Sequence, residues 1–411
     1  MLTPRLSLPV VSSLIFCLAS FSPVRARAAD PPKGEIRALW VTRWDFKTEK
    51  DIRRAVRWSA AVGFNRIFLQ VRGRADAFYR SSIEPWGEEI GGRDPGFDPL
   101  QIAIEESQKT GIQLHAWINV LPAWKGSTPP RDPGHVLHRY PEWFIEDSNG
   151  KRHMLDAADY TILNPCLPEV RSYLVRVVSD IVSRYAVDGV HFDYVRFVGK
   201  ETAGEAEFPY DPRSLALFRK FAAGSPKTAP EEWERWKRAS VNTVIYRLSK
   251  AVKEVRPKAV VSVAVLQDYG RARKKFLQDV VAWQSFPYLD EIYPMTYHES
   301  SADFAFYADA ALRGMTAKKV IPGIGAHLHD RVSQTTRQIQ VSRTLGAAGY
   351  CVFGFASLFP SPSHESKGDE ASRRLRAELR AALLSLNGKK KPAGDSPTAA
   401  RPESGASTPK L

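Results

Sequence analysis

Several features that are rare or missing in this sequence exclude whole classes of protein. It has three cysteines in 411 residues, and Cys17 lies in a segment expected to be cleaved off. The remaining two, Cys166 and Cys351, are too far apart for a disulfide framework or a thiolate metal site, so we expect buried free thiols. Beyond the first 30 residues no apolar run could cross a membrane. The net charge of +14 includes no dense basic stripe, which argues against nucleic-acid binding.

Familiar cofactor and metal motifs are also missing. No G-x-G-x-x-G follows the first expected strand, which disfavours an open dinucleotide-binding sheet. That strand reads Trp40-Val41-Thr42 where barrel amidohydrolases carry H-x-H, and no H-E-x-x-H occurs. The sequence therefore predicts no cofactor and no metal. A metal-dependent polysaccharide deacetylase or amidohydrolase stays open as an alternative, because five residues could form its ligand set: His115, His191, His298, Asp193 and Asp268.

The composition is that of an exported globular protein. Hydrophobic residues make up 43% and aromatic residues 11%, enough for a large core. Residues 1–29 read as a signal peptide, with an apolar run and an A-x-A site at 26–28. We expect a periplasmic or secreted protein without a transmembrane anchor. Residues 388–411 are rich in Lys, Pro, Ala, Ser and Gly, which predicts a disordered tail. The diffuse positive charge suits association with an anionic cell wall.

Between these ends, residues 30–387 alternate regularly between strand and helix patterns. Strands are expected at 35–42, 64–71, 112–118, 188–197, 259–266, 290–297, 319–325 and 349–355. Helices are expected at 48–62, 98–110, 166–185, 213–255 with a break, 274–285, 302–313, 333–345 and 369–386. Eight such units predict a single α/β domain, a (β/α)8 TIM barrel. Long loops follow strands 2, 3 and 4, and about 45 irregular residues are expected after the third strand.

The fourth strand carries an unusual pattern. Its alternation places Val190 and Phe192 on one face and His191 and Asp193 on the other. Carboxylates are almost never buried without a partner or a task. Asp193 is therefore interpreted as a catalytic carboxylate at the mouth of the barrel. The alternative is a buried ion pair with Arg196 or Arg72.

Active sites of such barrels lie at the carboxyl ends of the strands. Those ends are crowded here with aromatic, basic and amide side chains, while the opposite ends are small or polar. Aromatic rings stack on sugar faces and polar groups bind hydroxyls, so the mouth is predicted to bind a sugar. The predicted substrate-binding residues are Trp40, Arg43, Gln70, Arg72, Asp76, His115, Trp117, Asn119, Trp124, His191, Arg196, Tyr297 and His298.

Glycoside hydrolysis commonly uses two carboxylates that flank the scissile bond. Asp193 is the best placed, with Arg72 and Arg196 able to keep it ionised. Glu299 and Asp268, on neighbouring strands, are both candidates for the second role, and the sequence does not choose between them. Asp290 and Glu291 begin a strand, at the wrong end of the barrel, and are expected to be structural. A carbohydrate-binding barrel without activity stays open as a further alternative.

Several segments resemble the bacterial family-10-like glycosyl hydrolases, over nearly all of residues 35–360. They are Glu35-Ile36-Arg37-Ala38-Leu39-Trp40-Val41, Gln70-Val71-Arg72, Glu84-Pro85-Trp86, His115-Ala116-Trp117-Ile118-Asn119, Asp188 to Arg196 and Tyr293-Pro294-Met295-Thr296-Tyr297. This group includes a divisome-associated hydrolase of peptide-stripped peptidoglycan strands. The resemblance implies that Asp193 is the family's carboxylate on strand four. It also implies an exported hydrolase of an amino-sugar polymer, with peptidoglycan glycan as the expected substrate.

A partial likeness to chitinase-type barrels points away from their mechanism. The fourth strand of those enzymes reads D-G-x-D-x-D-x-E, and the final Glu is the acid. This chain has Val195 at that position, and His191 replaces another Asp. Because the chitinase acid is absent, the acid here must be a different residue.

Overall fold

The computed structural model describes residues 31–197, 207–362 and 370–389. The expected signal peptide, 1–29, and the expected tail from residue 390 onward lie outside these ranges. In the described part of the chain, no helix is both long and apolar enough to cross a bilayer. Cys166 and Cys351 are buried free thiols, as expected, and burial raises the pKa of the Cys166 thiol to about 12.

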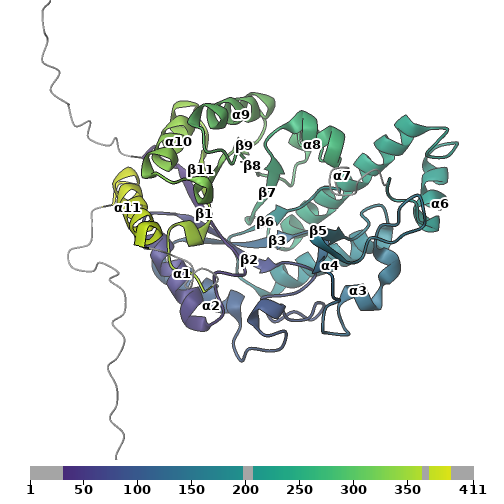
Figure 1. Ribbon diagram of the computed structural model, residues 1–411, viewed down its shortest axis with the longest axis horizontal. Coiled ribbons are helices and arrows are strands. Elements are labelled where there is room, and N and C mark those ends of the chain that lie inside the picture. The colour runs from purple at the N-terminus through teal and green to yellow at the C-terminus, as the bar shows by residue number, and fades with distance from the viewer. Residues whose placement is uncertain (1–30, 198–206, 363–369, 390–411) are drawn as a thin grey trace, which may run out of the picture.

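Parallel strands form one curled sheet at the centre of the molecule (Figure 1). In order around the sheet they are β10 (Gly323–Gly325), β11 (Gly349–Phe353), β1 (Ile36–Val41), β2 (Arg66–Arg72), β3 (Gln113–Asn119), β6 (Gly189–Asp193), β7 (Val260–Leu266), β8 (Glu291–Met295) and β9 (Lys319–Val320). Only Ile321 and Pro322 separate β9 from β10. The Ile321 N–H donates to Ile292 O in β8, and the Cys351 N–H donates to Pro322 O, both at 3.0 Å. The two short strands are therefore halves of one, and the sheet closes as the predicted eight-stranded barrel.

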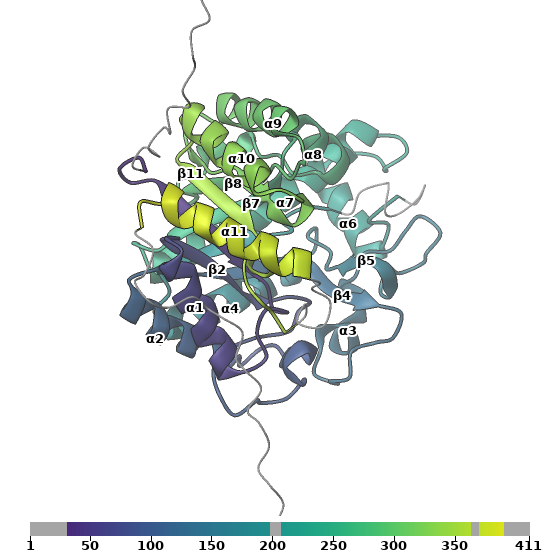
Figure 2. The ribbon, with the colours of Figure 1, turned by 60° about the vertical axis from the view of Figure 1, so that its left-hand side comes forward.

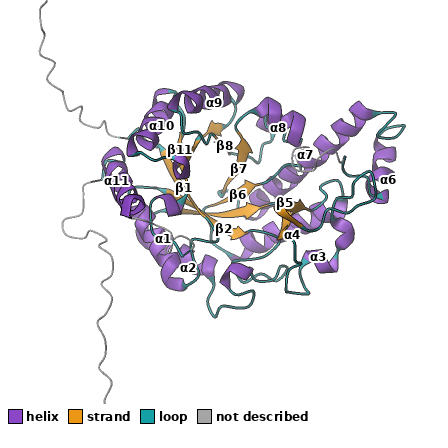
Figure 3. Cartoon of the chain, in the orientation of Figure 1, coloured by secondary structure: helices purple, strands orange, loops and turns teal. Residues whose placement is uncertain are grey.

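Helices surround the strands (Figure 3). They are α1 (Glu49–Ala61), α2 (Pro99–Thr110), α4 (Pro168–Arg184), α6 (Pro212–Phe221), α7 (Pro230–Val255), α8 (Tyr269–Phe276), α9 (Ser301–Gly314), α10 (Val332–Thr344) and α11 (Glu370–Leu386). Local sequence sets their ends: Thr48 forms a capping box with Asp51 at the start of α1, and Gly111 ends α2 with φ 71°. The last helix, α11, lies beside α1 and α10 in Figure 2. There Asn387 donates to Val62 O at 3.1 Å, which ties the end of the chain to its first helix.

The expected helix at 274–285 is wrong. Helix α8 ends at Phe276, Leu277 takes a left-handed conformation with φ 55°, and a short 3-10 helix, η3, follows at Ala282–Ser285. The break turns Gln278 inward. Its side chain accepts from Leu266 N at 2.9 Å and donates to Val195 O at 3.2 Å. Gln278 thus joins the end of β7 to the segment after β6, and a continuous helix could not present it there.

The segment after β3 is also more ordered than expected. It contains an antiparallel pair, β4 (Pro122–Gly126) and β5 (Asp156–Ile162), with the short helices α3 (Val136–Arg139) and η2 (Pro141–Trp143) between them. The sequence has no clear two-residue alternation here, and about thirty residues separate the two strands. The sequence pattern therefore did not predict this strand pair. The pair lies next to the segments that follow β1 and β2, since the Tyr160 hydroxyl on β5 accepts from Arg43 at 3.2 Å and the Trp124 ring on β4 lies 4.3 Å from the Arg74 guanidinium.

The two faces of the barrel strands carry different side chains. Val190 and Phe192 face the helices, within the large apolar core. The interior holds a smaller cluster that includes Trp40, Phe68 and Tyr293. At the amino ends of the strands Arg66 pairs with Glu291 at 2.5 Å inside the barrel, so Glu291 is structural, as predicted.

Arg72, at the end of β2, links the loops that follow β2 and β3. It is fully buried, and its guanidinium contacts both oxygens of Glu84 at 2.9 Å. Its Nη1 donates to the carbonyls of Asn119 and Val120, just after β3. The Tyr173 hydroxyl donates to the same Glu84. The prediction that Arg72 faces Asp193 or a sugar is therefore wrong, because its donors are used within the protein.

Removing the charge of Glu84, the partner of the buried Arg72 guanidinium, should destabilise the loops or the whole domain. We expect Glu84→Gln to lower the free energy of unfolding by about 3–5 kcal/mol, since a guanidinium is left in the core without its counter-charge. Urea denaturation measures this. Asp94→Asn, which breaks the exposed pair with Arg80, should cost less than about 1 kcal/mol. Similar losses of unfolding free energy in the two variants would contradict the role of the Arg72–Glu84 pair in holding the loops.

Candidate active site

Asp193 lies at the last position of β6, level with Asn119 on β3. Its side chain is 5% exposed, and its Oδ1 accepts the Tyr194 N–H at 2.6 Å. Burial raises the pKa of this carboxyl, and the opposing effects of Arg196, the Tyr194 N–H and the Trp117 indole are smaller. Of the two arginines expected to keep Asp193 ionised, Arg196 does lower its pKa, but burial has the larger effect, and Arg72 is bonded to Glu84 instead.

The backbone beside Asp193 is strained. Tyr194 has φ 54°, a left-handed conformation that few residues other than glycine adopt. Such strain often occurs at functional sites, where it aims a neighbouring group. The turn places the Arg196 guanidinium 4.2 Å from the centre of the Tyr194 ring. Nη1 of Arg196 is buried and has no hydrogen-bond partner among the described residues, so it can serve a ligand.

Aromatic rings form a floor next to Asp193. Tyr297, which follows β8, stacks on Phe353 with ring centres 5.5 Å apart and meets the edge of Trp40 at 6.2 Å. Burial raises the pKa of Tyr297 well above its ordinary value, and the nearby Asp193 adds to the effect. Its phenol therefore stays neutral and can donate. Trp40 is only 1% exposed, so it supports this floor from below.

A second fixed arginine lies on the β1–β2 side of the mouth. Arg43 donates to Glu89 at 2.8 Å, in the short helix η1 (Glu88–Ile90), to Gln70 at 3.3 Å and to the Tyr160 hydroxyl at 3.2 Å. Its guanidinium lies 3.8 Å from the centre of the Trp44 ring. Trp44 is 42% exposed. The pair makes a ready stacking surface for a sugar ring, and Trp44, Glu89 and Tyr160 are residues that sequence reasoning missed.

His115 and His191, predicted to bind substrate at the mouth, lie inside the barrel instead. Both are 0% exposed. His191 stacks on Phe68 at 3.9 Å and accepts from the Trp40 indole at 3.1 Å, so its Nδ1–H donates to Ser262 Oγ at 2.9 Å. His115 packs against Gly189, where any Cβ would come within 2.6 Å of the imidazole. Burial lowers the pKa of each well below its ordinary value, so both imidazoles are neutral.

The remaining candidates are spread around the mouth. Asp268 is exposed and caps α8 by accepting from Arg271 N, so its carboxylate has a structural task. Glu299 is exposed on the segment between β8 and α9. His298 stacks on Tyr307 at 5.1 Å. Across the ranges that the structure describes, no three His, Cys, Asp or Glu side chains are placed to share a metal ion.

Two other predicted residues meet away from Asp193. Asp76, after β2, and Trp124, on β4, line a separate pocket with Trp86 and His135. Trp117 and Asn119 remain beside Asp193 at the end of β3, and the Asn119 Oδ1 is buried without a hydrogen-bond partner in the described structure. The mouth therefore offers both donors and acceptors around one protonatable carboxyl.

Comparison with known proteins agrees with this geometry. The family model described as Glycosyl hydrolase-like 10 matches residues 35–343. The chain belongs to this family. It is 29% identical to Glycosyl hydrolase YngK of Bacillus subtilis over 201 residues, 48% of this chain and 36% of that protein. It is also 29% identical to Glycosyl hydrolase DigH of Escherichia coli K12 over 209 residues, 48% of this chain and 43% of that protein. The matched part thus spans less than half the length of these curated relatives.

Solved structures share the fold of this chain. The glycoside hydrolase domain of PgaB from Bordetella bronchiseptica superposes with a TM-score of 0.58 at 14% identity, covering 84% of this chain and 99% of that domain. The catalytic domain of β-amylase from Paenibacillus polymyxa gives 0.56 at 9% identity, covering 86% and 98%. At these identities the likeness shows the (β/α)8 barrel fold that the sequence predicted.

The raised pKa of Asp193 makes a prediction about stability. The folded protein binds the carboxyl proton more tightly than the unfolded chain, so this stability is present at acid pH and is lost as pH rises through the folded-state pKa. Asp193→Asn should therefore raise the free energy of unfolding at neutral pH, with a smaller gain at acid pH. Urea denaturation at both pH values measures it. A loss of about 3–5 kcal/mol at neutral pH would instead support a buried ion pair with Arg196.

Proposed function

We propose that this chain is an exported glycoside hydrolase in which protonated Asp193 is the general acid. The observation that carries the proposal is a carboxyl at the mouth of a glycosidase barrel, 5% exposed, whose pKa is raised by burial. A carboxyl in this state can hold its proton until substrate arrives. Asp193 would also supply the acid that this chain otherwise lacks, since Val195 stands where chitinase-type barrels have their acidic Glu.

In the reaction, Asp193 gives its proton to the glycosidic oxygen as the bond from that oxygen to the sugar carbon breaks. Water supplies the hydroxyl to the sugar, and its proton is taken by a second carboxylate. Of the two predicted candidates for this second carboxylate, we choose Glu299, on the segment after β8, because Asp268 caps helix α8. Arg196 and Tyr297 offer donors to substrate oxygens, and the floor of Tyr297 and Phe353 offers a ring to stack on.

The proposed substrate is an amino-sugar polymer, with peptidoglycan glycan strands as the specific case. The net charge of +14 favours work near anionic cell-wall material, and the residues that resemble the family-10-like group support the same polymer. The proposed location is the periplasm or the exterior, because residues 1–29 have the pattern of a signal peptide. The metal-dependent deacetylase has less support, because His115 and His191 lie below the mouth, inside the barrel.

Product analysis tests the activity and the substrate together. Mature protein is incubated with intact and with peptide-stripped peptidoglycan, with and without a chelator, and products are identified by mass spectrometry. We expect glycan fragments from stripped strands, unaffected by chelator, and a rate lower by several orders of magnitude in Asp193→Asn. Asp268→Asn, which keeps an oxygen for the α8 cap, should retain activity. Acetate release abolished by chelator would replace the proposal with a deacetylase, and binding without products would replace it with a binding barrel.

The pH dependence of the rate follows from the same carboxyl. Because a general acid works only while protonated, activity should fall as pH rises through the raised pKa of Asp193. The alkaline limb of kcat/KM against pH measures this in the free enzyme. It should keep its position in Asp268→Asn. A limb that lies at the ordinary pKa of an exposed aspartate would contradict the role of Asp193 as the acid.

A further inference from the structure

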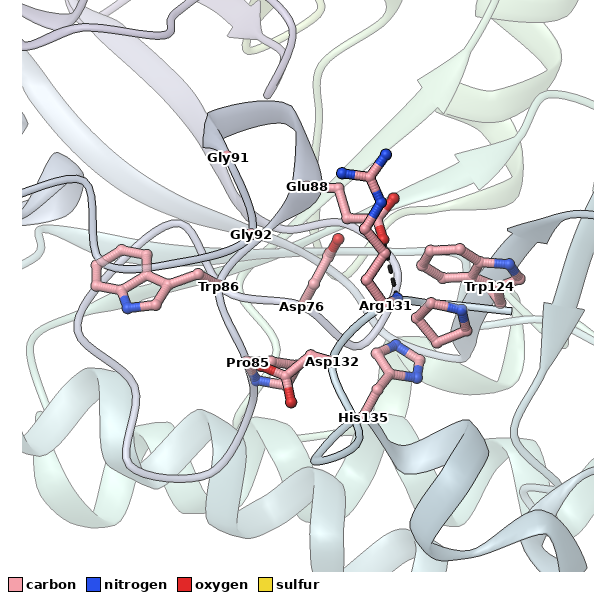
Figure 4. Close-up of a pocket in the computed structure, with 11 residues that line it drawn as sticks. Asp76, Pro85, Trp86, Glu88, Gly91, Gly92, Trp124, Arg131, Asp132 and His135 are labelled. Carbon is pink, nitrogen blue, oxygen red and sulfur yellow. Dashed lines mark hydrogen bonds between the residues drawn. The ribbon is translucent and has the colours of Figure 1, made fainter. Parts of the chain in front are cut away.

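A small pocket opens between the loops that follow β2 and β3 (Figure 4). Trp86 and Trp124 both line it, and in Figure 4 Asp76 lies between them, with the Trp86 ring pointing away from Asp76. Pro85 and Pro130 complete the apolar part of its lining. Trp124 is fixed, since its indole donates to Thr128 O at 2.7 Å and its ring meets His135 edge-on at 5.4 Å. The walls are therefore built before any ligand arrives.

The carboxylate of Asp76 has one oxygen used and one free. Oδ1 accepts the N–H groups of Arg74 at 2.7 Å and of Gly73 at 3.3 Å, which holds the turn after β2. The residue is only 2% exposed, and its Oδ2 is buried without a hydrogen-bond partner in the described structure. A buried acceptor without a donor costs free energy, so the site favours a ligand that brings an N–H or O–H.

The charge around Oδ2 favours a neutral donor over a cation. Arg74 Nε lies 3.7 Å from Oδ2, and the same guanidinium lies 4.3 Å from the centre of the Trp124 ring and 3.3 Å from Glu89. Arg74 is held there because His135 donates to its carbonyl at 2.8 Å. The negative charge of Asp76 is thus already partly balanced, and what Oδ2 lacks is a hydrogen-bond donor.

The size of the pocket narrows the ligand further. Its cavity volume is about 60 Å³. A single water needs roughly 10–15 Å³ of cavity, so the pocket takes a group of about four to six heavy atoms. An acetamido group has four, one of them an N–H donor and one an apolar methyl. A whole sugar ring is too large for this volume, but its acetamido substituent fits.

We propose that this pocket recognises the N-acetyl group of an amino sugar, with the amide N–H donating to Asp76 Oδ2 and the methyl packing against Trp124, Pro85 and Pro130. The proposal rests on the proposed glycosidase function and names its substrate class more narrowly. Asp76 and Asp193 belong to one rim: Asp76 follows β2 and Asp193 ends β6, and these two strands flank β3 in the sheet. A glycan bound at Asp193 can therefore extend a neighbouring residue toward this pocket.

The isosteric variant Asp76→Asn isolates the contact. Asparagine keeps an oxygen for the N–H groups of Gly73 and Arg74, so the turn is retained, but it places an NH2 where Oδ2 was. Two donors then face each other, and the acetamido contact is lost. The matched control is Asp94→Asn in the same loop, whose Oδ1 accepts Gly96 N at 2.8 Å in the same kind of turn outside the pocket.

The test measures binding without turnover. Each variant is made in full-length Asp193→Asn protein and titrated with peptide-free glycan strands, before and after chemical de-N-acetylation, following tryptophan fluorescence and calorimetry. We expect Asp76→Asn to weaken binding of N-acetylated strands about 10- to 100-fold, with little change for de-N-acetylated strands and none for Asp94→Asn. Chemical re-N-acetylation should restore the difference. Thermal melting confirms that the variants are folded.

The outcomes separate this inference from the proposed function. Equal binding of both strand types by Asp76→Asn and its parent would overturn the acetamido site, even if the unmodified protein cleaves the strands. A preference for de-N-acetylated strands that Asp76→Asn abolishes would overturn it in favour of an ammonium site. Acetyl-dependent binding at Asp76, with no cleavage by the unmodified protein, would support the pocket and refute the hydrolase.

Discussion

Desolvation of one carboxyl at the end of β6 is the constraint around which the mouth of the barrel is arranged. Asp193 is 5% exposed, and the rings and amide around it provide little that would stabilise a negative charge. A buried carboxyl then holds its proton more tightly than in water. The strained turn at Tyr194 and the neutral phenol of Tyr297 keep polar but uncharged groups near it. The site is thus suited to an acid that must stay protonated between reactions.

The other strong charges near the mouth are fixed in pairs of their own. Arg72 is occupied by Glu84 and by the carbonyls after β3, and Arg43 by Glu89, Gln70 and Tyr160. These cations order the loops without neutralising Asp193. Arg196 is the exception, since it acts on Asp193 directly and keeps a free donor. Arg72 and Arg43 therefore order the loops, while Arg196 affects the pKa of Asp193. A change at one of these arginines need not alter the role of the others.

The alternation of strands and helices was enough to predict the barrel and to put Asp193 on its inner face. Height along a strand was harder to predict. His115 is four residues before Asn119, so at about 3.3 Å per residue it lies roughly 13 Å deeper, inside the barrel. His191 is two residues before Asp193 and lies about 7 Å below it. Both share a face with mouth residues, yet neither reaches the mouth.

Partners that depend on loop paths could not be predicted from periodicity. Glu84 meets Arg72 only because the loop after β2 folds back, and Gln278 turns inward only because α8 stops early. The pocket at Asp76 depends on the β4–β5 excursion, which showed no strand pattern. Residue type was a better guide there: Asp76 and Trp124 were selected because a carboxylate and an indole at strand ends suit sugars, and the fold brings them together.

The most direct test of the account is the pKa of Asp193 itself. Carbon-13 NMR of protein labelled at aspartate carboxyls can follow its titration, and the resonance is assigned by its disappearance in Asp193→Asn. The account predicts a midpoint above the ordinary aspartate value, because burial outweighs the field of Arg196. A midpoint at or below that value would mean that Asp193 is ionised when substrate arrives. It could then not be the acid.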